Sequence, residues 1–151
     1  LDAVATWLDQ NSQFEVEKVA PGTVLKVGHV YVGSSACESI RIENHESMQL
    51  RVAPEPVSEN NVDVLLQSVA QVYGSRAVVA LLSDAGDDGC NGLRAVRDAG
   101  GFTMVQDRAS SMIYDIPCRA RDAGSAVECL PINEIAERIQ MLMRLDHASS
   151  S

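Results

Sequence analysis

The chain has 151 residues, 46% of them hydrophobic, and its 21 acidic and 12 basic side chains give a formal charge of -9. This length suits one domain with a buried core and is too short for two ordinary domains. The negative charge repels phosphate backbones and anionic lipids, so nucleic acid is not expected as a partner.

The first third of the chain predicts one helix followed by short strands. Residues 1–10 carry apolar side chains at helical spacing. After them, β-type runs alternate with turn residues such as Pro21-Gly22, and strands are expected over 14–19, 24–27, 29–32, 39–43 and 48–52. We expect these strands to form a small antiparallel section of hairpins.

From Ser58 onward the pattern changes to alternating helices and strands. A polar start and apolar residues at helical spacing predict a helix that Gly74 ends, and the apolar run 76–82 predicts a strand buried on both faces. Later strands are expected over 102–105 and 127–130, with a helical turn at Pro117 and a final helix over 132–145. The pattern predicts an α/β fold with a doubly wound, mostly parallel Rossmann-like sheet.

The ends of the chain carry further expectations. Leu1 is not a methionine and already lies in a helical pattern, so we expect one domain over 1–146 that lacks its N-terminal part, with a polar, frayed and disordered tail over 147–151. No apolar run approaches the about 20 residues that span a bilayer. Leu1–Gln10 also lacks the pattern of a signal peptide, so we expect a cytoplasmic location and no membrane insertion.

The loop after the predicted strand 76–82 is the first candidate site, because ligands of doubly wound sheets bind beyond the carboxyl ends of the strands. It contains Asp84, Asp87 and Asp88. These aspartates suit three interpretations: caps of a helix N-terminus, ligands of a divalent metal, or the carboxylate that orients the histidine of a catalytic triad. A calcium loop is disfavoured because Ala95 stands where such a loop needs a glutamate.

Partners for a triad or a metal are harder to find in the sequence. His29, His45 and His147 have the sequence contexts of surface residues, and no G-x-S-x-G motif is present. Ser110 and Ser111 are expected to cap helices. No C-x-x-C pair occurs among the four cysteines, so neither a zinc site nor a redox dithiol is expected from Cys37, Cys90, Cys118 and Cys129.

Several segments resemble the catalytic domain of chemotaxis protein-glutamate methylesterases. The stretch LSDAGDDGCNG at 82–92 is similar to the family pattern L-T-G-M-G-x-D-G-A-x-G. Nearly the whole chain takes part in the resemblance, in the same order and at similar spacing, through Pro21-Gly22, 28–32, 62–65, 68–70, 99–101, Gln106, 109–111, Pro117, Ala120 and Gly124.

The resemblance implies a hydrolase that removes γ-methyl esters from glutamates of chemoreceptors, and possibly deamidates glutamine there, with a Ser-His-Asp triad and no metal or cofactor. It implies the cytoplasmic region of a methylated chemoreceptor and a response-regulator domain, upstream or in trans, as partners. Asp88 matches the triad aspartate, and Asp84, Ala85, Gly86, Asp87 and Gly89 complete the active-site loop. The family's serine and histidine precede the part that matches this chain, which alone is therefore expected to be inactive.

Two departures from the family pattern concern the same loop. Asp84 stands where the family has glycine, and Ala85 stands where it has methionine. A carboxylate near the oxyanion position opposes the negative charge of a tetrahedral intermediate. The alternative function is therefore a catalytically degenerate scaffold or binding module of a chemosensory system. Asp63 is a secondary candidate, either for substrate contact or for stabilising a helix N-terminus.

Overall fold

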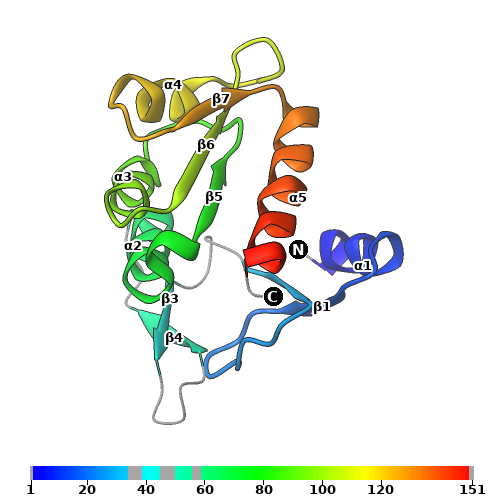
Figure 1. Ribbon diagram of the computed structural model, residues 1–151. Helices are drawn as coiled ribbons and strands as arrows, with labels where there is room; N and C mark the ends of the chain where they lie inside the picture. The colour runs from blue at the N-terminus through cyan, green and yellow to red at the C-terminus, as the bar shows by residue number, and fades with distance from the viewer. Residues whose placement is uncertain (1, 34–38, 45–49, 56–58, 150–151) are drawn as a thin grey trace.

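A computed structural model describes residues 2–33, 39–44, 50–55 and 59–149 of the chain. Its centre is a parallel sheet of strands β5 (Val78–Leu81), β6 (Phe102–Gln106) and β7 (Glu128–Leu130), in that order. Helices α3 (Cys90–Asp98) and α4 (Asp115–Asp122) lie on one side of this sheet, and α5 (Ile132–Ser149) lies on the other (Figure 1). The predicted doubly wound α/β class is thereby confirmed.

The core lies between this sheet and the helices α3, α4 and α2 (Asn61–Tyr73). Helix α2 ends at Gly74, as predicted; this residue has a φ of 54°, a conformation that glycine adopts at little cost. A short 3-10 turn, η1 (Gly74–Arg76), then leads into β5. The buried core side chains are apolar residues of these elements: Leu66, Ala70, Ala77, Leu81, Leu93, Val96, Val105, Ile116 and Ala120.

The first third contains α1 (Asp2–Asn11) and two separate strand pairs. Strands β3 (Ser39–Asn44) and β4 (Leu50–Glu55) form the predicted antiparallel hairpin; positions 48 and 49 of the predicted strand 48–52 lie outside the described residues. Strands β1 (Glu15–Lys18) and β2 (His29–Val32), however, pair in parallel, so the prediction of antiparallel hairpins is wrong for this pair.

The connection 19–28 explains the parallel pairing. After β1 the chain leaves this pair and joins β4, where Gly22 N–H donates to the Val52 carbonyl at 2.8 Å and Val52 N–H donates to the Thr23 carbonyl at 2.9 Å. It then returns to the end from which β1 started, as a crossover does. The strand predicted over 24–27 is replaced by irregular backbone whose Lys26 N–H and Val24 carbonyl bind the Tyr31 hydroxyl.

The final helix, α5, reaches Ser149 and so includes residues 147–149 of the segment for which the sequence predicts a frayed tail. In the described part of the chain, each helix is too short or too polar to span a bilayer.

Candidate active-site loop

The loop 82–89 leaves the carboxyl end of β5 and is fastened to the segment before α4. Ser83 N–H donates to Oε1 of Gln106 at 2.8 Å. The Ser83 hydroxyl donates to the carbonyl of Ile113 and accepts its N–H, both at 2.9 Å, and Ile116 N–H donates to the Asp84 carbonyl at 3.2 Å. The loop therefore lies where the sequence predicts it, at the carboxyl edge of the parallel sheet.

A buried amide supports this edge from the next strand. Gln106, which is 5% exposed, donates through Nε2 to the carbonyl of Ser110 at 2.7 Å. The Ser110 hydroxyl accepts the N–H of Ile132 at 3.1 Å, so it caps the start of α5, in agreement with the predicted capping role. The Ser111 hydroxyl instead donates to the carbonyl of Asp107 at 2.6 Å; its predicted role as a helix cap is wrong.

Asp88 holds the N-terminus of the neighbouring helix α2. Its two carboxylate oxygens accept the N–H groups of Val62 and Asp63, at 3.0 and 2.9 Å. Asn60, the N-cap residue of α2, makes no side-chain cap bond, so Asp88 satisfies two donors that the helix leaves open. The positive end of the α2 dipole also favours the negative charge of Asp88. The capping interpretation is correct, but the capped helix is not the one that follows the loop.

Asp63 performs the reciprocal function for α3. Its side chain is 5% exposed and accepts the N–H of Gly92 at 2.6 Å and the Nδ2–H of Asn91 at 3.1 Å. The N-cap residue of α3, Gly89, provides no side chain for this purpose. Helix α3 is therefore capped by Asp63 of α2, and α2 is capped by Asp88 of the loop that leads into α3. The prediction that Asp63 stabilises a helix N-terminus holds for α3, and the buried carboxylate is occupied by these two bonds.

Two glycines permit the close contact of α2 and α3. A Cβ atom added at Gly92 would lie 2.6 Å from Cβ of Leu66 and 3.0 Å from the Asp63 carbonyl oxygen. One added at Gly89 would lie 2.9 Å from Cγ1 of Val62, and the φ of Gly89, 101°, is itself unfavourable for other residues. The glycines of the 82–92 motif thus keep the two capping aspartates within reach of their helices.

The outer part of the loop is exposed. Asp84, Ala85, Gly86 and Asp87 all lie at the surface. Oδ1 of Asp84 accepts the N–H of Ala85 at 2.8 Å. Asp84, which stands where the family pattern has glycine, therefore occupies the backbone N–H donor next to it. The loop aspartates do not form a group of three mutually close ligand atoms in the region that the structure covers, which disfavours the divalent-metal interpretation.

Cys90 stands at the first position of α3, where a helix dipole alone would lower the pKa of a thiol. Burial, and after it the carboxylates of Asp63 and Asp87, instead raises the pKa of the Cys90 thiol. The thiol therefore stays protonated at neutral pH and is a poor nucleophile.

This protonation predicts a pH dependence of alkylation. Because iodoacetamide reacts with the thiolate, we expect Cys90 to be modified slowly at pH 7. Its rate of modification is expected to reach half its maximum at a pH above the ordinary thiol pKa of about 8.5. The exposed Cys129 is the internal control for reagent and time. Site-resolved mass spectrometry of the alkylated chain measures both; a Cys90 rate that is already maximal at pH 7 contradicts the prediction.

The three histidines have different positions relative to this loop. His29 lies in β2, His147 lies in α5, and His45 is outside the described residues. Among the four cysteines, Cys37 is also outside the described residues. His29, the histidine whose side chain the structure describes, contacts the Val27 carbonyl and is not hydrogen-bonded to Asp88. The structure thus brings Asp63 and Asp88 together with two helix ends, and it does not bring His29 to the predicted triad aspartate.

The fold and the loop define the class of protein: a doubly wound α/β domain that presents an anchored carboxylate at the carboxyl edge of its parallel sheet. Within this class, the family model described as CheB methylesterase matches residues 1–139. The chain belongs to the CheB methylesterase family.

Individual relatives agree with this assignment. The chain is 32% identical over 144 residues to a protein-glutamate methylesterase/protein-glutamine glutaminase of Moorella thermoacetica, and 36% identical over 136 residues to the protein of that name from Mesorhizobium japonicum. The alignments cover 93% and 88% of this chain, but 34% and 39% of the two relatives. The chain thus spans somewhat more than a third of the length of these proteins.

A solved structure shares the fold. The crystal structure of the Thermotoga maritima CheB methylesterase catalytic domain superposes with a TM-score of 0.83 at 23% sequence identity. The superposition covers 95% of this chain and 76% of that one.

Proposed function

We propose that this domain supplies the aspartate of a Ser-His-Asp esterase that hydrolyses γ-methyl esters of glutamate on chemoreceptors. Membership of the CheB methylesterase family and the names of the relatives support this activity, and deamidation of glutamine is the related reaction that those names include. The observation that carries the proposal is the anchoring of Asp88 by two backbone N–H groups at the sheet edge.

The anchoring suits the chemistry of a triad. Each oxygen of Asp88 accepts one N–H, and a carboxylate has about four lone-pair sites, so acceptor positions remain for a histidine N–H. In the proposed reaction the histidine removes the proton of the serine hydroxyl, the serine oxygen attacks the ester carbonyl, and methanol leaves with that proton. Water then hydrolyses the acyl-serine by the same route and releases the glutamate. Asp88 orients the imidazole and stabilises its charged form.

The serine and the histidine are proposed to come from a segment outside these 151 residues. Strand β5 is bonded only to β6 in the described sheet, and Val78 and Leu82 are 38% and 46% exposed, so its free edge is available to a further strand. The proposed partners are the cytoplasmic region of a methylated chemoreceptor and a response-regulator domain, upstream or in trans. The proposed location is the cytoplasm, where both occur.

One observation favours a second function, a degenerate family member that serves as a scaffold in a chemosensory system. The Asp84 carboxylate accepts the Ala85 N–H, and the family resemblance implies that the backbone at position 85 lies beside the active site. A donor occupied in this way does not stabilise the negative oxygen of the intermediate, and the carboxylate charge opposes it.

Asp84→Gly distinguishes the two functions. It frees the Ala85 N–H and removes one negative charge, so methanol release from methylated receptor by the full-length natural protein is expected to rise at least about tenfold. Asp98→Gly, at an exposed aspartate at the end of α3 and outside the loop, is the matched control and leaves the rate within about twofold of the unaltered protein, since surface changes away from specific contacts have small effects. Absence of methanol release from all three well-folded proteins supports the scaffold instead.

A further inference from the structure

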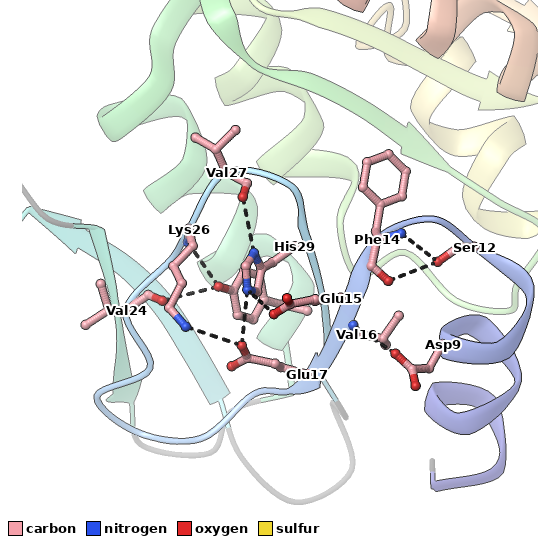
Figure 2. Close-up of polar contacts among 11 residues, drawn as sticks. Asp9, Ser12, Phe14, Glu15, Val16, Glu17, Val24, Lys26, Val27 and His29 are labelled. Atoms are coloured by element: carbon pink, nitrogen blue, oxygen red, sulfur yellow. Dashed lines mark hydrogen bonds and ion pairs between the residues drawn. The ribbon is translucent and has the colours of Figure 1, made fainter.

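A second cluster of titratable side chains lies on the β1–β2 pair, away from the loop 82–89. The parallel register places Glu15 opposite His29, and Glu17 projects from the same face of β1 because strand side chains alternate. Figure 2 shows both carboxylates directed at the imidazole of His29. Nε2 of His29 lies 2.9 Å from Oε2 of Glu15 and 3.5 Å from Oε1 of Glu17.

The imidazole is held in one orientation by its surroundings. Nδ1 of His29 lies 3.2 Å from the carbonyl oxygen of Val27, and a carbonyl only accepts, so Nδ1 carries the proton of this bond. The ring also lies nearly parallel to that of Tyr31, at 15° and 6.0 Å between centroids. The Tyr31 hydroxyl in turn binds the backbone of Lys26 and Val24. With the Nδ1 proton used in the bond to the Val27 carbonyl, Nε2 is the ring nitrogen that faces the two glutamates.

Three acceptor atoms then face one another. Nε2 is buried and makes no hydrogen bond, although both carboxylates lie within ion-pair distance of it. Lone pairs on Nε2 and on two carboxylates repel one another unless a cation lies between them. A hydrogen bond needs the acceptor along the N–H axis, whereas the other ligands of a metal surround the ion and lie off that axis. The off-axis carboxylates of this cluster fit the second arrangement.

We propose that Glu15, Glu17 and His29 bind a divalent transition-metal cation of the zinc type. The three ligand atoms lie within 4.8 Å of one another. Tetrahedral coordination at zinc bond lengths separates ligand atoms by about 3.4 Å. The His29–Glu17 distance of 3.5 Å already matches this, and Glu15, whose side chain is 80% exposed, moves outward from 2.9 Å without disturbing the fold. Water completes the coordination.

The donor set selects the metal. One imidazole and two carboxylates suit zinc and its neighbours in the transition series, while calcium and magnesium prefer ligands that are all oxygen. The hydrogen bond from Nδ1 to the Val27 carbonyl fixes the orientation of the ring, as a bond on the second ring nitrogen commonly does in a metal-binding histidine. The site joins β1 to β2 and does not depend on the esterase function proposed for Asp88.

Lys26 competes with the metal. Its Nζ lies 3.6 Å from Oε1 of Glu17, and its side chain is 58% exposed, so it is free to turn into solvent when the cation binds. Displacing one exposed ion pair costs about 0.2–1 kcal/mol, which corresponds to a change in affinity of about 1.4- to 5-fold. Removal of this lysine charge is therefore expected to tighten the metal site, an effect that a purely structural His–Glu contact does not predict.

Calorimetric titration of zinc chloride into the full chain tests the proposal. His29→Ala is expected to weaken binding at least about tenfold. His147→Ala, which also removes one histidine and keeps all four cysteines, is expected to leave it unchanged. Glu15→Gln, at an exposed side chain that leaves the fold intact, is expected to weaken binding as well, and Lys26→Gln is expected to strengthen it about 1.4- to 5-fold.

Thermal melting gives an independent readout, because a ligand that binds only the folded state raises the melting temperature. Zinc is expected to raise it in the unaltered chain and much less in Glu15→Gln, whereas calcium and magnesium at the same concentration raise it in neither. Equal zinc affinity in the unaltered chain and Glu15→Gln, or equal losses in His29→Ala and His147→Ala, overturns the proposal.

Discussion

Asp88→Ala is expected to lower the free energy of unfolding by about 2 kcal/mol, because it leaves the N–H groups of Val62 and Asp63 without an acceptor at the start of α2. Urea unfolding followed by circular dichroism measures the change. Asp87→Ala is the matched control: the neighbouring side chain is exposed, and the backbone carbonyl that accepts the Cys90 N–H stays in place. Equal stability of the two variants would falsify the cross-capping of α2 by Asp88.

The same substitution affects activity for two different reasons, and Asp88→Asn separates them. The asparagine keeps one oxygen for the helix N–H groups, so its stability loss is expected to be about half that of alanine. If Asp88 orients the triad histidine, however, the amide favours the wrong tautomer and methanol release by the full-length protein falls by about 10⁴-fold. A nearly stable Asp88→Asn protein with unchanged methanol release rules out the catalytic role and leaves the capping role intact.

Gly92→Ala is the second substitution with a large expected effect, and intrinsic helix propensity predicts its sign wrongly. In an exposed helix, alanine in place of glycine stabilises by about 1 kcal/mol. Here the new Cβ meets Leu66 and Asp63 at 3.0 Å or less, so α3 must move away from α2 and the bond from Gly92 N–H to Asp63 lengthens. We expect a net loss of about 2 kcal/mol in the free energy of unfolding.

Chemical denaturation of the purified chain checks this value. A matched variant is Asp63→Asn, which keeps the size of the side chain and one oxygen for Gly92 N–H, so it is expected to lose less than Gly92→Ala. Stabilisation by Gly92→Ala instead would show that the two helices separate at little cost. The close contact of α2 and α3 would then not account for the glycine at position 92.

Much of the functional loop is predictable from local sequence. An apolar β-type run followed by a glycine-rich acidic turn and a helical pattern places the loop at a sheet edge, and β5, the loop and α3 occur there. The strand is not buried on both faces as the sequence predicts, because Val78 at its start is 38% exposed. The partners of its aspartates are not predictable in this way. Asp88 binds N–H groups 25 and 26 positions earlier, and Asp63 binds a group 29 positions later. Local patterns carry no information on contacts of that separation.

The Glu15, Glu17 and His29 cluster shows the same limit. Two glutamates at alternate positions of a strand are visible in the sequence as one polar face. His29 joins them only because the connection 19–28 returns to make a parallel pair; an antiparallel hairpin would place a different part of β2 opposite Glu15. The error in the predicted strand direction and the failure to predict this cluster therefore have one cause.

The sequence by itself determined the α/β class, most helices and strands from Ser58 onward, and the family resemblance, because burial periodicity and turn residues act over a few positions. Only the tertiary structure decided the direction of β1 relative to β2, the exchange of caps between α2 and α3, and the occupation of the Ala85 N–H by Asp84. These features depend on the path of the chain between distant segments and on hydrogen-bond geometry within a loop, and neither is encoded in hydrophobic spacing.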